Sequence, residues 1–475
     1  MPSVLVAHSY FLRFDPKQFE RAKPYPPLAT LEVATLLRQH GHAPALFDAM
    51  LAEGVDDFAR ALAEAAPAVL VLYEDNYNYL SKMCLARMRD AACQMIQLAK
   101  ATGARVLVAG SDVSDAPAPY VQAGADAALR GEGLEALPAV VEHLLRRPHA
   151  PMPTLPGVIH PATLPAPSSC ASNTVIRLPG QAGGGTDLAA AWDLIDVERY
   201  RQMWLRVHGR FSLNMAGSKG CSFRCSWCAK PIWGQRYQQR RAAAVAREMV
   251  ALKLQLRPDH IWFADDIFGF RVDWVQRFAD ELQRQGGGLP FTIQTRADLI
   301  SPAMARALRE AGCSEVWLGA ESGSQKVLDA MRKGTTVREI REARQLLGAE
   351  GIRVGFFIQL GYLGEGLPEL LETRRLIEQT RPDDVGVSVA YPLPGTPFYE
   401  EVRSQLQGKT HWDDSADLAM MFQGAFDTTT YRQVRALLHA EVDARSPAER
   451  ADVARRWEAL LDTLQPQELS AALEA

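Results

Sequence analysis

The chain has 475 residues, of which 47% are hydrophobic and 23% charged, and its formal net charge is −4. This length exceeds one ordinary core, so two or three domains are expected, and the composition is that of a soluble globular enzyme. The small net charge gives no electrostatic reason to expect a nucleic acid as partner, and no apolar run reaches the roughly 18 to 20 residues of a membrane helix. The N-terminus enters an apolar run directly, without the features of an export signal, so a cytoplasmic location is expected.

Cysteine usage points to a reducing compartment and to one special cluster. Seven cysteines are too few for a disulfide scaffold, and an odd number cannot all pair within the chain. Cys84, Cys93 and Cys313 lie in apolar contexts and are predicted to pack in the core. Cys221, Cys225 and Cys228 instead fall within eight residues of one another.

Residues 1–145 alternate short apolar runs with helical patterns, which predicts a parallel α/β sheet covered on both faces, a Rossmann-like domain of the flavodoxin-like type. The predicted strands are Val4–Ala7, Ala45–Phe47, Val69–Tyr73, Val106–Ala109 and Ala125–Leu129. The predicted helices include Leu28–Gln39, Leu80–Ala101 and Leu134–Leu145. Ligands of such sheets bind at the carboxyl ends of the strands.

Residues 146–205 are predicted to form a linker, because eight prolines and a run of three glycines between Arg146 and Gly185 disfavour regular structure. A second alternation in residues 206–399 predicts a partial (β/α)6 barrel of TIM type, with its site at the carboxyl ends of the strands. Its predicted strands are Phe211–Met215, His260–Ala264, Phe291–Gln294, Glu315–Leu318, Val354–Leu360 and Val385–Ala390. Residues 400–475 are predicted to form a C-terminal helical region.

The cysteine cluster has the spacing C-x3-C-x2-C and follows the first predicted barrel strand. Three thiolates on one short loop can bind three irons of a [4Fe–4S] cubane and leave the fourth iron open for a further ligand. The alternative, a structural zinc site, wants four ligands, and no fourth Cys or His follows before His260.

This loop resembles that of the radical S-adenosylmethionine (SAM) superfamily, with Trp227 at the aromatic position of C-x3-C-x-aromatic-C, and the resemblance covers roughly residues 211–399. It implies that Cys221, Cys225 and Cys228 hold a [4Fe–4S] cluster. It also implies that SAM binds the open iron and that an electron from the cluster cleaves SAM to a 5′-deoxyadenosyl radical.

The resemblance further implies SAM contacts at the ends of three later strands, made by Asp265, Asp266, Glu321, Ser322, Gln359 and Leu360. Asp265 and Asp266 could instead cap the following helix, and only one of the two is expected to touch SAM. Glu321 would be costly to bury unpaired, which favours a ligand role. Lys333 either neutralises the carboxylate of SAM or is a solvated surface charge.

The N-terminal domain resembles the cobalamin-binding domain that precedes the barrel in many radical SAM enzymes. The resemblance implies cobalamin contacts from Asp48, Met50, Glu74, Gly110, Ser111, Gly131 and Glu132. The cobalamin motif D-x-H-x-x-G places a histidine on cobalt, whereas this chain has Met50 at that place. Either cobalamin binds without a histidine ligand, or the domain keeps the fold without the cofactor. The loop 73–79 lines the corrin or a substrate pocket, or its tyrosines pack on the linker.

Together the resemblances imply a cobalamin-dependent radical SAM methyltransferase that acts on an unactivated carbon of a small molecule, with an electron donor such as flavodoxin or ferredoxin. The segment Trp412–Phe422 also resembles the anaerobic magnesium-protoporphyrin monomethyl ester cyclase group, which performs an oxidative ring closure. A cobalamin- or metal-binding sensor is the non-enzymatic alternative. The tail from Arg432 onward shows no basic, aromatic-bearing module, which argues against an RNA substrate.

Overall fold

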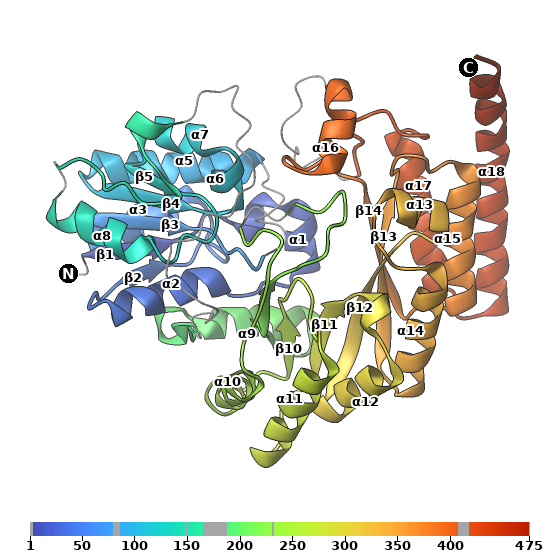
Figure 1. Ribbon diagram of the computed structural model, residues 1–475, viewed down its shortest axis with the longest axis horizontal. Coiled ribbons are helices and arrows are strands. Elements are labelled where there is room, and N and C mark those ends of the chain that lie inside the picture. Colours follow the sequence, from blue (N-terminus) through green and yellow to red (C-terminus); the bar gives the residue numbers. More distant parts are fainter. Residues whose placement is uncertain are drawn as a thin grey trace.

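The computed structural model describes residues 3–78, 86–147, 150–164, 188–229, 232–406 and 418–474, with only the backbone of 465–474. Two sheets of six strands each dominate this part of the chain, and Figure 1 shows the first on the left and the second at the centre and right. Both are built from parallel βα units, so the predicted α/β fold class is confirmed. Cys84, which was predicted to pack in the core, and most of the segment Trp412–Phe422 lie outside the described residues.

The first sheet has the strand order β2-β1-β3-β4-β5-β6. Its first five strands are parallel in the flavodoxin-like order 2-1-3-4-5, as predicted. The strands are β1 (Val4–Ala7), β2 (Ala45–Phe47), β3 (Val69–Tyr73), β4 (Arg105–Ala109), β5 (Ala127–Leu129) and β6 (Val158–Ile159). The helices of this half are α1 (Pro16–Arg21), α2 (Leu28–Gln39), α3 (Val55–Ala65), α5 (Ala86–Ala101), α6 (Ser111–Asp115), α7 (Pro117–Gln122) and α8 (Leu137–Arg146).

Alternate residues of the first sheet pack against different helices, because successive strand side chains point to opposite faces. Val4 and Val6 join the apolar cluster that contains the buried sides of α2 and α8. Leu5 and Ala7 join the cluster that contains those of α3 and α5. With both faces covered, the carboxyl edge of the sheet is left for polar groups.

The predicted linker contains regular structure, contrary to the expectation from its prolines. Strand β6 pairs antiparallel with β5 and closes that edge of the first sheet. Helix α9 (Val197–His208) then packs Tyr200 and Trp204 into the core of the second half. Trp204 Nε1 donates to the carbonyl of Pro24 at 2.7 Å, so α9 ties the two halves together.

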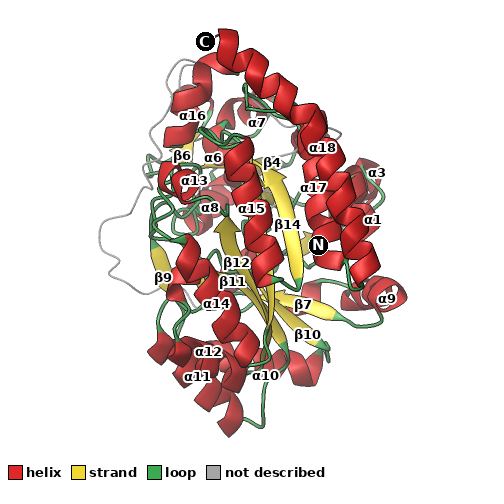
Figure 2. Ribbon diagram, turned by 90° about the vertical axis from the view of Figure 1, so that its right-hand side faces the viewer, coloured by secondary structure: helices red, strands yellow, loops and turns green. Residues whose placement is uncertain are grey.

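The second sheet has the strand order β7-β10-β11-β12-β13-β14, all parallel, with each strand beside the next in the sequence. The strands are β7 (Ser212–Met215), β10 (His260–Phe263), β11 (Phe291–Thr295), β12 (Cys313–Glu321), β13 (Arg353–Leu360) and β14 (Asp384–Val389). Helices cover its outer face, and Figure 2 shows the strands fanned behind them. They are α10 (Ala242–Gln255), α11 (Val272–Arg284), α12 (Pro302–Ala311), α13 (Gln325–Ala330), α14 (Val337–Ala349) and α15 (Leu367–Thr380). This arrangement is the predicted partial barrel.

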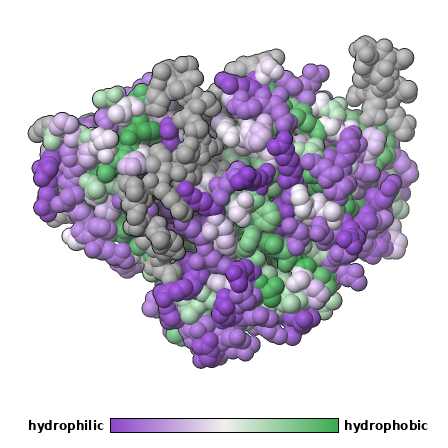
Figure 3. Space-filling view, viewed as in Figure 1, coloured by the Kyte–Doolittle hydropathy of each residue, from purple (hydrophilic) through white to green (hydrophobic). Residues whose placement is uncertain are grey.

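The C-terminal residues are helical in the described part, as predicted. They form α16 (Pro397–Val402), α17 (Thr428–Asp443) and α18 (Pro447–Glu474), and Figure 1 shows α18 at the right-hand edge of the molecule. No helix among the described residues is long and apolar enough to cross a membrane. The face in Figure 3 is mostly hydrophilic, with apolar patches between the two halves and below them.

Candidate functional site

The three clustered cysteines lie on the loop that connects the two strands of a small hairpin at the carboxyl end of β7. The hairpin is formed by β8 (Ser218–Gly220) and β9 (Tyr237–Gln239), which pair antiparallel. Gly220, just before Cys221, has a φ of 76°, and a Cβ there would lie 2.3 Å from the carbonyl oxygen of Arg236. A glycine is therefore required to start the loop. Cys221, Cys225 and Cys228 are all half-buried and form no disulfide with a described cysteine.

The loop is held from the ends of later barrel elements. The backbone N–H of Ser226 donates to the carbonyl of Met331 at 2.9 Å. The carbonyl of Ser226 in turn accepts from the backbone N–H of Phe398 at 3.1 Å. The hydroxyls of Ser226 and Tyr362 lie 2.8 Å apart. Trp227, the predicted aromatic residue, is partly buried against the apolar cluster that contains Met331 and Tyr362. Its role is to anchor the loop by packing.

The cysteines form a donor set that suits an iron–sulfur cluster. Within the described residues, no three His, Cys, Asp or Glu side chains gather closely enough to hold a single metal ion. A cubane takes three thiolates on three different irons, so its ligands stand further apart than those of one ion. The buried guanidinium of Arg296 lies with Nη1 3.7 Å from Cys225 Sγ, and it places a cation beside a group that would be negatively charged. The residues present therefore fit the cluster.

Glu321 and Lys333 form a buried ion pair at the end of β12, with Lys333 Nζ 2.7 Å from Glu321 Oε1. Only 7% of each side chain is exposed, so Lys333 is not a surface charge and Glu321 is not unpaired. Because Lys333 compensates the charge of Glu321, the cost of burying an unpaired carboxylate does not by itself argue for a ligand role of Glu321. Glu321 also has a φ of 60°, at a register shift between β12 and β13. Strain of this kind in a non-glycine residue clusters at functional sites.

Ser322, next to Glu321, is turned away from the barrel opening. Its hydroxyl lies 3.1 Å from that of Thr373 on α15 and accepts from the backbone N–H of Ser324 at 3.1 Å. The side chain is fully buried. Any contact of Ser322 with a ligand would therefore come from its backbone.

The two aspartates after β10 differ in burial. Asp265 is 1% exposed, and its carboxylate accepts from the backbone N–H of Gly217 at 2.9 Å and from the hydroxyl of Ser218. Burial raises the pKa of Asp265 to about 7. Asp266 is half-buried. Asp265 thus fixes the segment that leads into the cysteine loop.

The end of β13 presents one polar side chain. Gln359 is 6% exposed, and its Oε1 has no hydrogen-bond partner in the described part of the chain. A buried acceptor without a partner is costly, so this atom suits a ligand that donates a hydrogen bond. The side chain of Leu360 lies in the apolar core, and its carbonyl accepts from the backbone N–H of Ala390 at 2.8 Å.

At the carboxyl edge of the first sheet, His8 lies beside Asp48. His8 follows β1, whereas the cobalamin motif places its histidine after β2. His8 Nε2 is 3.0 Å from Asp48 Oδ1, and its buried Nδ1 has no partner in the described structure. Tyr200 of α9 donates to Asp48 Oδ2 at 2.6 Å. Burial acts to raise the pKa of Asp48, but the hydrogen bonds and charge of His8 hold it below its usual value. Met50 packs in the apolar core, which removes its sulfur from the edge.

Glu74, Gly110 and Ser111 meet at the same edge. The Glu74 carboxylate accepts from the backbone N–H of Ser9 at 3.0 Å, and burial raises its pKa. Gly110 has a φ of 156°, and a Cβ there would lie 2.7 Å from Glu74 Cβ, so no larger residue fits. The Ser111 hydroxyl is buried and has no partner among the described residues. This hydroxyl is available to a ligand at the sheet edge.

The loop after β5 joins the first sheet to the cysteine loop. Glu132 Oε1 lies 2.7 Å from Nζ of Lys219, which stands two residues before Cys221. Lys219 Nζ also lies 2.9 Å from Glu32 Oε2 on α2. Gly131, beside Glu132, donates its backbone N–H to Ser114 Oγ at 2.9 Å. The predicted ligand-binding edges of the two sheets are thus connected directly through Lys219.

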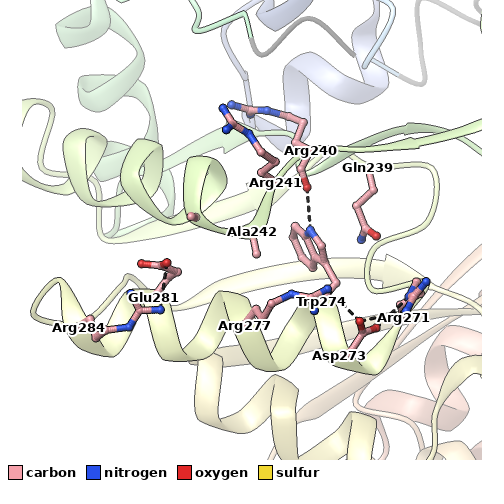
Figure 4. A pocket seen from close by; sticks show the side chains of 11 residues that line it. Gln239, Arg240, Arg241, Ala242, Arg271, Asp273, Trp274, Arg277, Glu281 and Arg284 are labelled. Carbon is pink, nitrogen blue, oxygen red and sulfur yellow. Dashed lines mark hydrogen bonds and ion pairs between the residues drawn. The ribbon is translucent and has the colours of Figure 1, made fainter. Parts of the chain in front are cut away.

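A groove of about 610 Å³ lies on the outside of the barrel, between α10 and α11 (Figure 4). Five arginines and two acids line the groove, and Asp273 pairs with Arg271 and Arg277, each at 2.9 Å. Glu281 likewise pairs with Arg284 at 3.0 Å. None of the cysteines or predicted SAM and cobalamin contacts lines this groove, so it is separate from the candidate site.

Sequence reasoning missed Glu32, Lys219 and Arg296. Glu32 was detectable as a single acidic residue within the apolar stretch of α2. Lys219 stands directly before the cysteine motif, and Arg296 directly follows β11, where ligand-contacting residues gather in barrels. The partners of these side chains lie far away in the sequence.

Comparison with known proteins agrees with this geometry. Residues 215–377 match the Radical SAM superfamily. An uncharacterized methyltransferase of Pyrococcus horikoshii is 26% identical over 212 residues, which cover 44% of this chain and 45% of that protein. The anaerobic magnesium-protoporphyrin IX monomethyl ester cyclase of Rubrivivax gelatinosus is 26% identical over 219 residues, covering 46% and 39%. The chain thus spans less than half the length of these relatives.

Among solved structures, the radical SAM methyltransferase TsrM of Kitasatospora setae, with cobalamin and a [4Fe–4S] cluster bound, is similar to this chain with a TM-score of 0.66. The similarity covers 87% of this chain and 80% of TsrM at 19% identity, so it concerns the fold and extends over both halves. The match of residues 215–377, with the cysteine loop at the end of β7, identifies the second half. The second half thus carries a domain that matches the Radical SAM superfamily over residues 215–377.

Proposed function

We propose that this chain is a cobalamin-dependent radical SAM methyltransferase that acts on a small molecule. One observation carries the proposal: Lys219, two residues before the first clustered cysteine, pairs with Glu132 at the carboxyl edge of the first sheet. Ligands of parallel α/β sheets bind at that edge. Groups bound by the two halves would therefore face each other, as transfer between two cofactors requires.

The proposed ligands of each group are residues of this chain. Cys221, Cys225 and Cys228 would hold a [4Fe–4S] cluster, Asp266, Glu321, Gln359 and the backbone at 322 and 360 would contact SAM, and Asp48, Glu74, Gly110, Ser111, Gly131 and Glu132 would border cobalamin. When bound, these groups supply the low-potential electron, the 5′-deoxyadenosyl radical and the methyl carrier. The protein positions them and excludes water from the space between them.

The proposed chemistry needs an electron donor and intact thiols. A small acidic redox protein such as flavodoxin or ferredoxin is the proposed donor. Because the cysteines must stay reduced until they bind iron, we also propose that the protein works in a reducing compartment, the cytoplasm. The cysteines of the described part form no disulfide, in keeping with this.

The second candidate is an oxidative ring closure, which the similarity to the magnesium-protoporphyrin cyclase favours. Both candidates use the same loop and the same two sheets. They differ in the fate of SAM, since methyl transfer releases S-adenosylhomocysteine and radical oxidation by itself does not. The products formed from SAM therefore separate them.

The test is anaerobic reconstitution with iron, sulfide and cobalamin, followed by titanium(III) citrate and SAM, with nucleosides identified by mass spectrometry. The proposal predicts S-adenosylhomocysteine that depends on cobalamin and 5′-deoxyadenosine that depends on the cluster. Cys225→Ala, the matched control, should lose 5′-deoxyadenosine, because it removes a ligand of the cluster. 5′-Deoxyadenosine alone would favour the oxidase, and unchanged SAM would favour a sensor.

A further inference from the structure

Arg296 is a buried arginine beside one of the cluster cysteines. It directly follows β11 and is 4% exposed. Its Nη1 lies 3.7 Å from Cys225 Sγ, within the range of a hydrogen bond to sulfur. Burying a guanidinium is costly unless its N–H groups and charge are compensated, so each of its contacts needs an explanation.

The other contacts of Arg296 fix its position from three sides. Asp298 accepts from Nε and Nη2 at 2.9 and 3.0 Å, and so balances the charge. Nη2 also donates to the carbonyl of Lys333 at 2.7 Å and to the hydroxyl of Thr335 at 2.9 Å. The guanidinium carbon lies 3.7 Å from the ring centroid of Phe223, which is part of the cysteine loop. A guanidinium held in this way is pre-organised.

A purely structural role explains only part of this arrangement. The bonds of Arg296 to the segment 333–335 use Nη2, and Nε donates to Asp298. Nη1 instead faces a cysteine sulfur, and a thiol is a weak hydrogen-bond acceptor while a thiolate is a strong one. The geometry is thus suited to a cysteine that is deprotonated by a metal.

We propose that Arg296 is a positioning residue that donates a hydrogen bond to the Cys225 thiolate and thereby raises the reduction potential of the cluster. Hydrogen bonds to the sulfur ligands and nearby positive charge stabilise the reduced, more negative form of an iron–sulfur cluster. The inference rests on the proposed function, because it requires that the loop holds a [4Fe–4S] cluster.

The test is a redox titration of the reconstituted cluster, without SAM, followed by electron paramagnetic resonance. In Arg296→Met, the ratio of reduced to oxidised cluster, measured at the wild-type midpoint potential, should fall about tenfold. For a one-electron couple, this corresponds to a midpoint potential that is about 59 mV more negative. Arg277→Met is the matched control, since it also removes one arginine, but one with 61% of its side chain exposed and paired with Asp273. Its midpoint should equal that of the wild type.

Iron and sulfide are quantified in every sample before titration, so that a failure of the proposed function can be distinguished from a failure of the role proposed for Arg296. A wild-type chain without a cubane would overturn the proposed function. A fully loaded Arg296→Met with the wild-type midpoint would overturn the role of Arg296 alone. If Arg296→Met holds no cluster, Thr335→Val and Arg296→Lys are titrated instead. Thr335→Val removes one hydrogen-bond partner of the guanidinium, and Arg296→Lys replaces the guanidinium by an ammonium group, so both keep a cation near the cluster. Wild-type midpoint potentials in both variants would refute the proposal.

Discussion

Lys219 Nζ lies 2.7 Å from Glu132 Oε1 and 2.9 Å from Glu32 Oε2, and it joins β8, the strand before the cysteine loop, to the first half of the chain. The exposed side-chain fractions are 10% for Lys219 and 7% for Glu32, so this is a largely buried triad. The Tyr77 hydroxyl donates to the other oxygen of Glu32 at 3.0 Å. Charge compensation at this lysine therefore contributes to holding the two halves together.

Lys219→Met should strongly destabilise the protein, because it leaves the Glu32 carboxylate buried without a countercharge. Removing one partner of a buried ion pair costs about 3–5 kcal/mol. The measurement is urea denaturation followed by tryptophan fluorescence. Lys326→Met is the control, since Lys326 pairs with Glu369 but is 64% exposed, and it should cost no more than about 1 kcal/mol. Equal losses in both variants would refute the role of the triad.

The pH dependence of stability should carry a contribution from Glu365, which is 4% exposed. Burial raises the pKa of Glu365 from 4.5 to about 8. The folded protein therefore binds more protons than the unfolded chain between these values, and stability falls with rising pH by up to about 1.4 kcal/mol per pH unit.

Glu365→Gln isolates this contribution from those of other buried acids. Its amide oxygen can still accept from the backbone N–H of Gly361, now 2.6 Å from Glu365 Oε1, and it does not ionise. The stability of the variant relative to the wild type should therefore increase between pH 5 and pH 8, as measured by urea denaturation. A difference that is constant over this range would show that Glu365 does not titrate there.

Glu321→Gln should weaken SAM binding if the carboxylate contacts SAM as proposed. Hydrogen bonds to charged groups contribute about 1.5–3 kcal/mol, so the Kd for SAM should rise at least about tenfold. Equilibrium dialysis of SAM against the reconstituted protein measures the Kd. Ser322→Ala is the control, because its hydroxyl faces Thr373, and it should leave the Kd within about threefold. An unchanged Kd in Glu321→Gln would restrict Glu321 to pairing with Lys333.

Ser111→Ala should weaken cobalamin binding without destabilising the free protein. The Ser111 hydroxyl is buried without a partner in the described structure, so removing it costs the unliganded fold little. One lost hydrogen bond of about 0.5–1.5 kcal/mol raises the Kd up to about tenfold. Absorbance titration with hydroxocobalamin gives the Kd, and thermal unfolding gives the stability. An unaltered Kd would remove Ser111 from the cobalamin site.

Local sequence patterns were enough to predict both sheets. Val4–Ala7 and Val69–Tyr73 form strands at the predicted residues, because strands of a parallel sheet are buried on both faces and read as continuous apolar runs. The cysteine spacing is equally local, since one loop carries all three side chains. The strand Glu315–Leu318 was predicted too short, because β12 continues through Gly319 to a Glu321 in the left-handed region.

The contacts that complete the site could not be predicted in this way. Lys219 is 187 residues from Glu32, and Arg296 is 71 residues from Cys225. Such pairs form only when separate βα units assemble, and no periodicity within a segment encodes them. The same holds for His8, whose approach to Asp48 follows from the pairing of β1 with β2.

The central claim is that Cys221, Cys225 and Cys228 hold a cubane with one iron open to SAM. The most direct measurement is electron paramagnetic resonance of the reduced, anaerobically reconstituted protein before and after SAM is added, with metal analysis of the same sample. We expect four irons per chain and a spectrum that changes when SAM binds. A single zinc on the three thiols, or a cluster spectrum that SAM leaves unchanged, would contradict the claim.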